Sequence, residues 1–134
     1  MNNDTISIIL SLLDINDVIK CSLINRRFNK VANSNYLWYN LCNRDYDKYY
    51  ENLKKETFYE TYKLCFDLDN LRLKFRLNDD IDKIYHLQKL SLPNNQIKEI
   101  PIEIGQLINL QELYLYNNQI KEIPIEIGQL INLQ

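Results

Sequence analysis

Two similar heptapeptides decide the fold of the C-terminal half: LQKLSLP at 87–93 and LQELYLY at 110–116. The same string, NNQIKEIPIEIGQLINLQ, follows each of them, at 94–111 and again at 117–134. The two copies differ at three pairs of positions, which are Lys89/Glu112, Ser91/Tyr114 and Pro93/Tyr116. Self-similarity at a fixed period predicts a stack of repeated coils, each covering the apolar face of its neighbour.

The heptapeptides alternate like a β-strand with one buried face. Leu90 and Leu92 lie two residues apart, so they point to one side of a strand, while residues 89, 91 and 93 point to the other side. All three differing pairs fall on that second side. The sequence therefore predicts strands whose solvent face carries the variation between the two copies.

Polar and small residues recur where the chain must turn between coils. Asn95 and Asn118 follow the predicted strands, and their side-chain amides can satisfy turn backbone groups of the adjacent coil. Gly105 and Gly128 recur on the return side of each coil. We expect these glycines to allow a tight bend there.

These strings resemble the leucine-rich repeat family in its 23-residue form. The pattern L-x-x-L-x-L-x-x-N-x-I-x-x-I-P-x-x-I-G-x-L-x-x fits both copies, which begin at Leu87 and Leu110. The resemblance implies that the outward strand face forms a concave, ligand-binding surface. The predicted target-binding residues are the variable ones: Lys89, Ser91, Pro93, Glu112, Tyr114 and Tyr116. The alternative is drift of solvent-exposed positions after a recent duplication, without selection for a ligand.

The sequence predicts unequal ends for the stack. Residues 77–86 reproduce part of the repeat spacing, and we interpret them as a half-repeat cap with a polar exterior. At the other end, residues 133–134 begin a third repeat. The Ile123, Ile127 and Leu130 face is then uncovered, which indicates a fragment or an edge that borrows a partner. Four isoleucines at usually polar positions are expected to pack between coils rather than to form a convex-side interface: Ile102, Ile108, Ile125 and Ile131.

The N-terminal half predicts short capped helices with more apolar surface than they can bury. Asp4, Asp14 and Asn25 each precede an apolar-periodic stretch and can cap a helix, the first of which runs to about Leu13. That helix has one apolar stripe for a core, and a second stripe on its other side includes Leu12. A bundle of this size buries too little surface to be robust alone, so we expect it to need a partner.

The same region resembles an F-box over about the first 42 residues. The resemblance is carried by ILSLLD at 9–14, Asp17 and Val18, SLINRRFNKVA at 22–32, and the Leu37-Trp38 pair. It implies binding to a Skp-type adaptor, which links the chain to a cullin and a RING ubiquitin ligase. The predicted adaptor-binding residues are Ile9, Leu10, Leu13, Ile15, Val18, Leu23, Ile24, Phe28, Leu37 and Trp38. An ordinary helical cap on the repeats is the alternative.

The two resemblances together imply an α+β chain that is a substrate-recognition adaptor of a Skp-cullin-F-box ubiquitin ligase. The rival interpretation is a leucine-rich-repeat scaffold outside the ubiquitin pathway, or a decoy that binds the adaptor without a productive target. The predicted domains are an F-box-like helical domain at 1–43, a helical connector at 44–76 and leucine-rich repeats at 77–134. The repeat domain contains the cap at 77–86, repeats at 87–109 and 110–132, and the start of a third at 133–134.

The connector has helical rather than linker character. It contains no Pro, Gly or Ser-rich stretch, and Phe58, Tyr62 and Cys65 recur at helical spacing. We therefore expect an amphipathic helix that joins the two modules.

Composition narrows the classes of function. The net charge of −2 gives no global basic field, so we expect neither nucleic acid nor a membrane as a partner. Three widely spaced cysteines indicate reduced core residues in an intracellular protein, cytoplasmic or nuclear, and no signal peptide is recognisable. The lone histidine, His86, and the scarcity of glycine predict no metal site, no cofactor and no catalytic activity.

Overall fold

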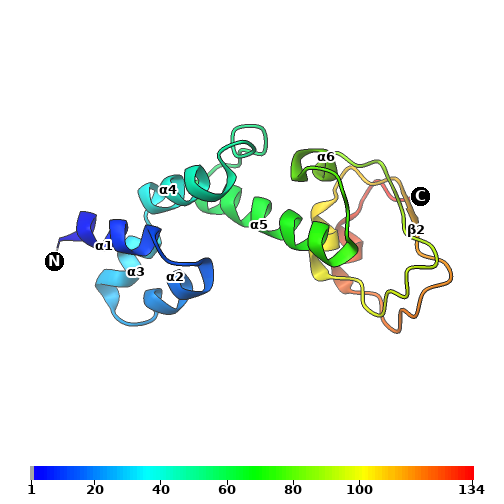
Figure 1. Ribbon diagram of the computed structural model, residues 1–134, viewed down its shortest axis with the longest axis horizontal. Coiled ribbons are helices and arrows are strands. Elements are labelled where there is room, and N and C mark those ends of the chain that lie inside the picture. Colours follow the sequence, from blue (N-terminus) through cyan, green and yellow to red (C-terminus); the bar gives the residue numbers. More distant parts are fainter. Residues whose placement is uncertain (1) are drawn as a thin grey trace. The chain divides into compact units, whose positions relative to one another are not determined.

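Side-chain caps set the starts of the N-terminal helices. The computed structural model describes residues 2–134 (Figure 1). Asn2, Asp14, Asn25 and Ser34 stand immediately before four helices, and each side chain accepts a hydrogen bond from a backbone N–H in the first turn. These helices are α1 (Asn3–Ser11), α2 (Ile15–Ser22), α3 (Arg26–Ala32) and α4 (Asn35–Tyr46).

The predicted caps at Asp14 and Asn25 are confirmed, but the predicted cap at Asp4 is wrong. Asn2 caps α1 instead, because its Oδ1 accepts from the Thr5 backbone N–H at 2.8 Å. Asp4 lies inside the first turn, where its negative charge interacts favourably with the positive end of the helix dipole. The helix also ends at Ser11, before the predicted Leu13.

The chain divides into two compact units, the first ending at Cys65 and the second beginning at Phe66. The long helix α5 (Phe58–Phe75) begins in the first unit and ends in the second. The helical spacing that predicted it corresponds to its buried side, since Tyr62 and Cys65 are both buried. The helical character expected for this part of the connector is confirmed.

The core of the first unit forms where α1, α4 and the start of α5 contribute their apolar sides. Leu10, Leu37 and Leu41 are completely inaccessible to solvent. Trp38 is anchored by its indole Nε1–H, which donates to the Ala32 carbonyl at 2.6 Å. Its ring packs at a steep angle against Tyr59, with 4.8 Å between the ring centroids.

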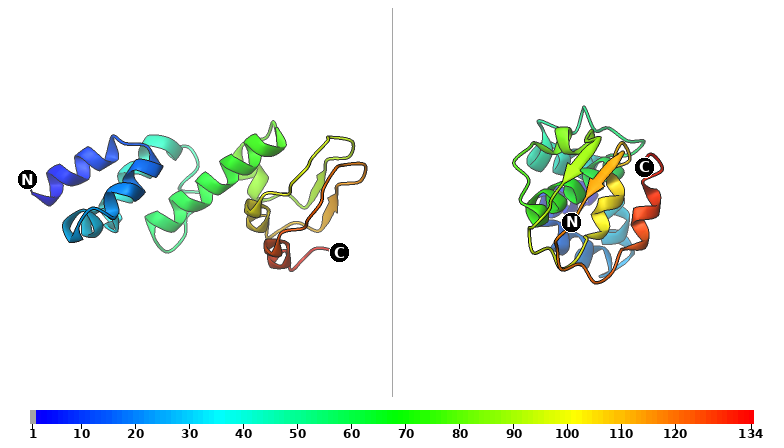
Figure 2. Two further views of the ribbon diagram at one scale, coloured as in Figure 1. Left: turned by 90° about the horizontal axis from the view of Figure 1, so that it is seen from below. Right: turned by 90° about the vertical axis from the view of Figure 1, so that its right-hand side faces the viewer.

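The second unit is built from coils with a strand on one side and a short 3₁₀ helix on the other (Figure 2). We name residues 87–109 coil 1 and residues 110–132 coil 2. Coil 1 contains β1 (Lys89–Ser91) and η1 (Ile102–Gln106), and coil 2 contains β2 (Glu112–Tyr114) and η2 (Ile125–Gln129). The two strands pair in parallel with Leu90 opposite Leu113, and α6 (Ile81–Tyr85) precedes coil 1. The predicted α+β fold is confirmed.

The Asn118 side chain joins coil 2 to the turn of coil 1, as the sequence predicted. The same prediction is wrong for Asn95, whose amide donates within its own coil, to the Pro93 carbonyl. Asn118 Oδ1 accepts from the backbone N–H groups of Asn95 and Ile97, each at 3.0 Å. Its Nδ2 donates to the carbonyls of Leu92 and Leu115, at 2.7 and 2.8 Å. All the hydrogen-bonding capacity of this amide is used, so Asn118 fixes one coil on the next.

A second amide ladder runs along the stack and was not anticipated from the sequence. Asn132 Nδ2 donates to the Ile108 carbonyl at 2.9 Å, and Asn109 Nδ2 donates to the Tyr85 carbonyl at 3.1 Å. The only sequence signal for it is that Asn109 and Asn132 recur at the repeat period.

Gly105 is needed for close packing rather than for a bend, so the predicted role of the two glycines is wrong. Neither has a positive φ. A Cβ added at Gly105 would come within 2.4 Å of Gln129 Oε1 and 3.1 Å of the Glu126 carbonyl, both of coil 2. At Gly128 an added Cβ meets nothing within 4 Å. The glycine therefore makes room for the next coil.

Coil 2 exposes positions that coil 1 buries. Ile100 is 7% exposed and its counterpart Ile123 is 67% exposed. Leu130, which was predicted to lie on the uncovered face, is buried. Four isoleucines were predicted to pack between coils, and that prediction is wrong because their side chains are exposed: Ile102, Ile108, Ile125 and Ile131. In the 3₁₀ turn of coil 1, it is Ile104 that is buried.

Candidate protein-interaction surfaces

Six aliphatic side chains of the first unit are exposed to solvent. They come from α1 and the residue that follows it, from α2 and from the turn before α3, and we name them the aliphatic set: Ile8, Ile9, Leu12, Ile19, Leu23 and Ile24. Leu23 is the most exposed, at 81%, and Leu12 follows at 76%. The second apolar stripe predicted on the first helix is thus confirmed as exposed at Ile8 and Leu12, whereas Ile15 is half-buried and begins α2. Ile9, which was predicted to face the core, is exposed. Contiguous exposed aliphatic groups are typical of interaction surfaces, so the aliphatic set is the candidate binding surface of the first unit.

The structure divides the ten predicted adaptor-binding residues into three groups. Ile9, Leu23 and Ile24 are exposed, and Leu13, Ile15 and Phe28 are half-buried. The remaining four are core residues that hold the helices together: Leu10, Val18, Leu37 and Trp38. The candidate surface therefore excludes Leu37 and Trp38, the two predicted residues on α4. It includes three exposed residues outside the predicted adaptor-binding set, which are Ile8, Leu12 and Ile19.

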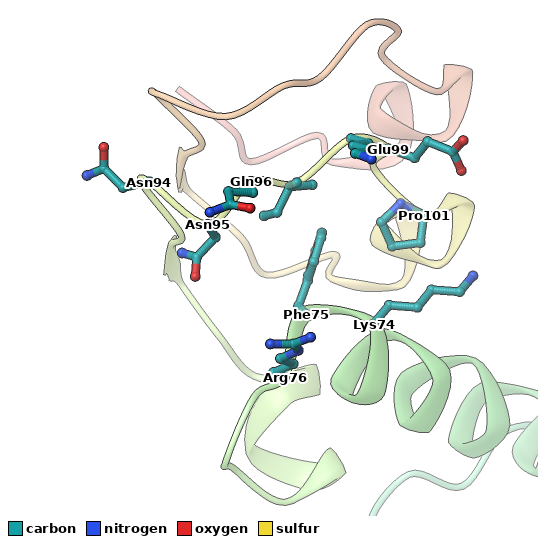
Figure 3. A pocket seen from close by; sticks show the side chains of 10 residues that line it. Lys74, Phe75, Arg76, Asn94, Asn95, Gln96, Glu99 and Pro101 are labelled. Atoms are coloured by element: carbon teal, nitrogen blue, oxygen red, sulfur yellow. The ribbon is translucent and has the colours of Figure 1, made fainter.

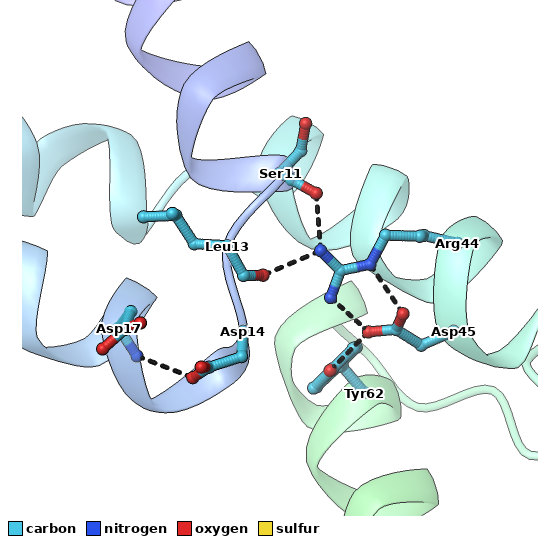
Figure 4. A network of polar contacts seen from close by, with 7 residues as sticks. All are labelled: Ser11, Leu13, Asp14, Asp17, Arg44, Asp45 and Tyr62. Atoms are coloured by element: carbon cyan, nitrogen blue, oxygen red, sulfur yellow. Dashed lines mark hydrogen bonds and ion pairs between the residues drawn. The ribbon is translucent and has the colours of Figure 1, made fainter.

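An arginine holds the end of α1 in place (Figure 4). Arg44 Nη1 donates to the carbonyls of Ser11 and Leu13, at 2.6 and 2.7 Å. The same guanidinium binds Asp45 through Nε and Nη2, at 2.6 Å each. Asp45 Oδ2 in turn accepts from the Tyr62 hydroxyl at 2.7 Å. We name this network the Arg44 clasp; it satisfies carbonyls that the end of a helix leaves unpaired.

The charges of the Arg44 clasp support one another. Partial burial raises the pKa of Asp45, but hydrogen bonds from Arg44 and Tyr62 outweigh it and leave that pKa below its usual value. Burial, followed by the bond to Asp45, raises the pKa of Tyr62. The network therefore keeps the carboxylate charged and the phenol protonated at neutral pH. No repeat or spacing in the sequence indicated it.

The outward face of β1 and β2, which the resemblance implies to be concave, carries a polar cluster that we name the concave cluster: Lys89, Glu112 and Tyr114. Lys89 on β1 lies opposite Glu112 on β2, and its Nζ is 2.9 Å from Glu112 Oε2. The same ammonium lies 4.9 Å from the centre of the Tyr114 ring, and the Tyr114 hydroxyl donates to Glu112 Oε2 at 2.9 Å. Three of the six predicted target-binding residues thus contact one another.

These contacts shift the titration of the concave cluster. The hydrogen bond from Lys89, with a second from Tyr114, lowers the pKa of Glu112. The bond to Glu112 raises the pKa of Lys89 and also that of Tyr114. Tyr116 and Ser91 are exposed beside this cluster, and Pro93 is half-buried. The face offers two exposed aromatic rings, Tyr114 at 41% and Tyr116 at 59%, next to a charged pair.

The cysteines are free thiols. Cys42 and Cys65 are buried, and burial raises their pKa values to about 11 and about 12. Cys21 is half-exposed, so its predicted place in the core is wrong. Across residues 2–134, no group of three or more His, Cys, Asp or Glu side chains could hold a metal ion. Within the same residues, no helix is both long and apolar enough to cross a membrane.

Two family models match the chain. The model described as F-box-like matches residues 3–44, which contain the whole aliphatic set. The model described as leucine-rich repeats in two copies matches residues 85–126, which contain β1, β2 and the concave cluster. Both resemblances drawn from the sequence are confirmed. No curated protein and no solved structure matches the chain.

Proposed function

We propose that this chain, which carries an F-box-like domain at its N-terminus and leucine-rich repeats after it, is a substrate-recognition adaptor of a Skp-cullin-F-box ubiquitin ligase. The order of the two modules is typical of such adaptors, whose role is generally binding rather than catalysis. On this proposal the first unit binds a Skp-type adaptor and the coils bind a protein target. The protein then acts inside the cell, in the cytoplasm or the nucleus.

One observation carries the proposal, namely that the aliphatic set lies entirely within the F-box-like residues. Burial of one leucine or isoleucine side chain contributes about 1.5–3 kcal/mol. Micromolar affinity corresponds to about 8 kcal/mol, so burial of about half of the set against a partner would account for much of that free energy before the costs of association. The Arg44 clasp supports this role, because it fixes the end of α1 on which Leu12 is presented.

The concave cluster is the proposed target surface. Tyr116 is a rigid aromatic side chain with a hydroxyl, which suits it to anchor a partner at low entropic cost. The paired Lys89 and Glu112 beside it would favour a target with complementary charges rather than a purely apolar one.

Co-purification tests the proposal directly. The full chain is co-expressed with a tagged Skp-type adaptor, and we expect the two to purify together. Leu23→Asp should abolish co-purification, because it places a charge in the apolar contact, and this exposed position should tolerate the change in the folded chain. Ile125→Asp, at an equally exposed position on the coils, is the matched control and should have no effect. Failure of the unaltered chain to bind any Skp-type adaptor would refute the proposal.

A second candidate is a scaffold or an adaptor-binding decoy without a ubiquitinated target. It is favoured by the internal pairing of Lys89, Glu112 and Tyr114, which leaves few concave groups free for a ligand. Reconstituted ubiquitination separates the candidates. A client whose modification requires Tyr116 supports the substrate adaptor, whereas recruitment of a cullin with no client supports the decoy.

A further inference from the structure

A pocket of about 740 Å³ lies in the second unit, between the end of α5 and the turn of coil 1 (Figure 3). Three cationic side chains line it, Lys74, Arg76 and Lys98, against one lining carboxylate, Glu99. Lys74 is already paired with Glu103 at 3.0 Å. Arg76 and Lys98 have no side-chain partner among residues 2–134. The pocket therefore holds two cationic groups that are available to an anion.

The contact between the coils shows what the polar groups at this pocket are suited to bind. Where coil 2 meets coil 1, Asn118 Oδ1 accepts from the backbone N–H groups of Asn95 and Ile97. The next residue, Gln119, donates its backbone N–H to the Ile97 carbonyl at 2.8 Å. In coil 2, this pair of residues thus recognises the backbone of a turning peptide.

The equivalent groups of coil 1 face the pocket and are unused. Asn95 and Gln96 line the pocket, and they are the counterparts of Asn118 and Gln119 in an identical stretch of sequence. Within the described chain, Asn95 Oδ1 accepts no hydrogen bond and the Gln96 backbone N–H donates none. In coil 2, these two groups form hydrogen bonds to the backbone of coil 1. In coil 1, the same two groups have no hydrogen-bond partner among the described residues. The pocket thus has one unused acceptor, Asn95 Oδ1, and one unused donor, the Gln96 N–H, in its lining residues.

The backbone around the pocket supports a binding role for the arginine. Arg76 directly follows α5 and has a φ of 53°, in a cap where the Leu77 N–H donates to the Arg72 carbonyl at 2.9 Å. Glycine is the favoured residue at this left-handed position, because it has no Cβ to clash. Gln96 also has a left-handed φ of 57, although its counterpart Gln119 does not. An arginine at this position costs backbone strain that a glycine would avoid. A guanidinium that binds a ligand would offset this cost.

We propose that this pocket binds a turning peptide segment with an acidic side chain, supplied by the target protein. The segment's backbone bonds to Asn95 Oδ1 and the Gln96 N–H, and its carboxylate pairs with Arg76 and Lys98. The inference rests on the proposed function for the identity of the partner, since it makes an acidic segment a feature of the ligase target. The pocket itself can be tested without the ligase.

Fluorescence anisotropy with two labelled octapeptide pools tests the pocket. Every second residue is Asp in one pool and Asn in the other, and the full chain is titrated into each. We expect the Asp pool to bind more tightly. Arg76→Gly should weaken binding of the Asp pool about tenfold or more, since a charge-assisted hydrogen bond is lost. Asn95→Ala should weaken binding of both pools, because it removes a contact to the backbone.

Arg76→Gly separates binding from folding. It relieves a left-handed arginine, so the variant should melt at a higher temperature than the unaltered chain while binding less peptide. Asn117→Gly is the matched control: Asn117 has φ 56 and does not line the pocket, so this variant should also gain stability and should bind peptide normally.

Two outcomes would overturn the inference: equal binding of the Asp and Asn pools, or unchanged binding by Arg76→Gly. The proposed function has a separate test in adaptor co-purification, which Arg76→Gly should not affect. If the chain binds the Asp pool but no Skp-type adaptor, the peptide-binding pocket is supported and the proposed ligase function is refuted. If the chain binds the adaptor but shows no preference for the Asp pool, the inference about the pocket is refuted and the proposed function is supported.

Discussion

Removal of the Asn118 side chain should loosen coil 2 from coil 1. Asn118→Ala deletes four hydrogen bonds, with donor-acceptor distances of 2.7 to 3.0 Å. Each contributes a net free energy of about 1 kcal/mol, and backbone groups that lose their partner are partly rescued by water at this half-buried site. We therefore expect the free energy of unfolding to fall by about 2–3 kcal/mol.

The matched control is Asn95→Ala, at the same position of coil 1. Its side chain donates one hydrogen bond, from Nδ2 to the Pro93 carbonyl at 3.0 Å, and that bond is exposed. The expected loss is below about 1 kcal/mol. Urea denaturation followed by circular dichroism gives both values, and amide hydrogen exchange at Asn95 and Ile97 should accelerate in Asn118→Ala. Equal losses in the two variants would refute the reasoning, because local sequence and not the neighbouring coil would then set the stability.

Three further predictions concern the glycines, the Arg44 clasp and the thiols. Gly105→Ala should lower the melting temperature, because its Cβ meets Gln129 and a backbone carbonyl, whereas Gly128→Ala has open space and should lose nothing. Asp45, whose pKa is depressed in the folded state, contributes stability above about pH 4 that is lost as the pH falls through its folded pKa. Urea midpoints of Asp45→Asn and the unaltered chain should thus differ at pH 7 and converge at acidic pH. At pH 8, a disulfide reagent should modify Cys21 in the native chain, and the two buried thiols only after unfolding.

The repeat could be predicted closely because its physics is local and periodic. Leu90 on the buried face, its exposed neighbours on β1 and the bridging role of Asn118 all follow from a strand and a turn repeated at one period. The caps at Asp14 and Asn25 likewise depend on residues within one helical turn. Interactions of short range leave their signal in the sequence.

Features that depend on distant parts of the chain could not be predicted. Arg44 reaches carbonyls more than thirty positions earlier, and no spacing rule encodes such a bond. The role of Gly105 is set by a glutamine of the next coil, so only the assembled stack shows it. The sorting of Leu10 into the core and Leu23 onto the surface also required the packed helices, since both fit the same family pattern.

The bridging amide of Asn118 also bears on how such a chain can lengthen. Each repeat encodes both the asparagine side chain and the turn backbone to which the asparagine of the next repeat bonds. An in-frame duplication of the repeat therefore supplies both partners of a new contact between coils. A crossover between misaligned copies of the gene would therefore yield a protein with one more fitted layer and an unaltered N-terminal domain. Recombination can adjust the length of the recognition surface without any new side-chain contact having to be selected.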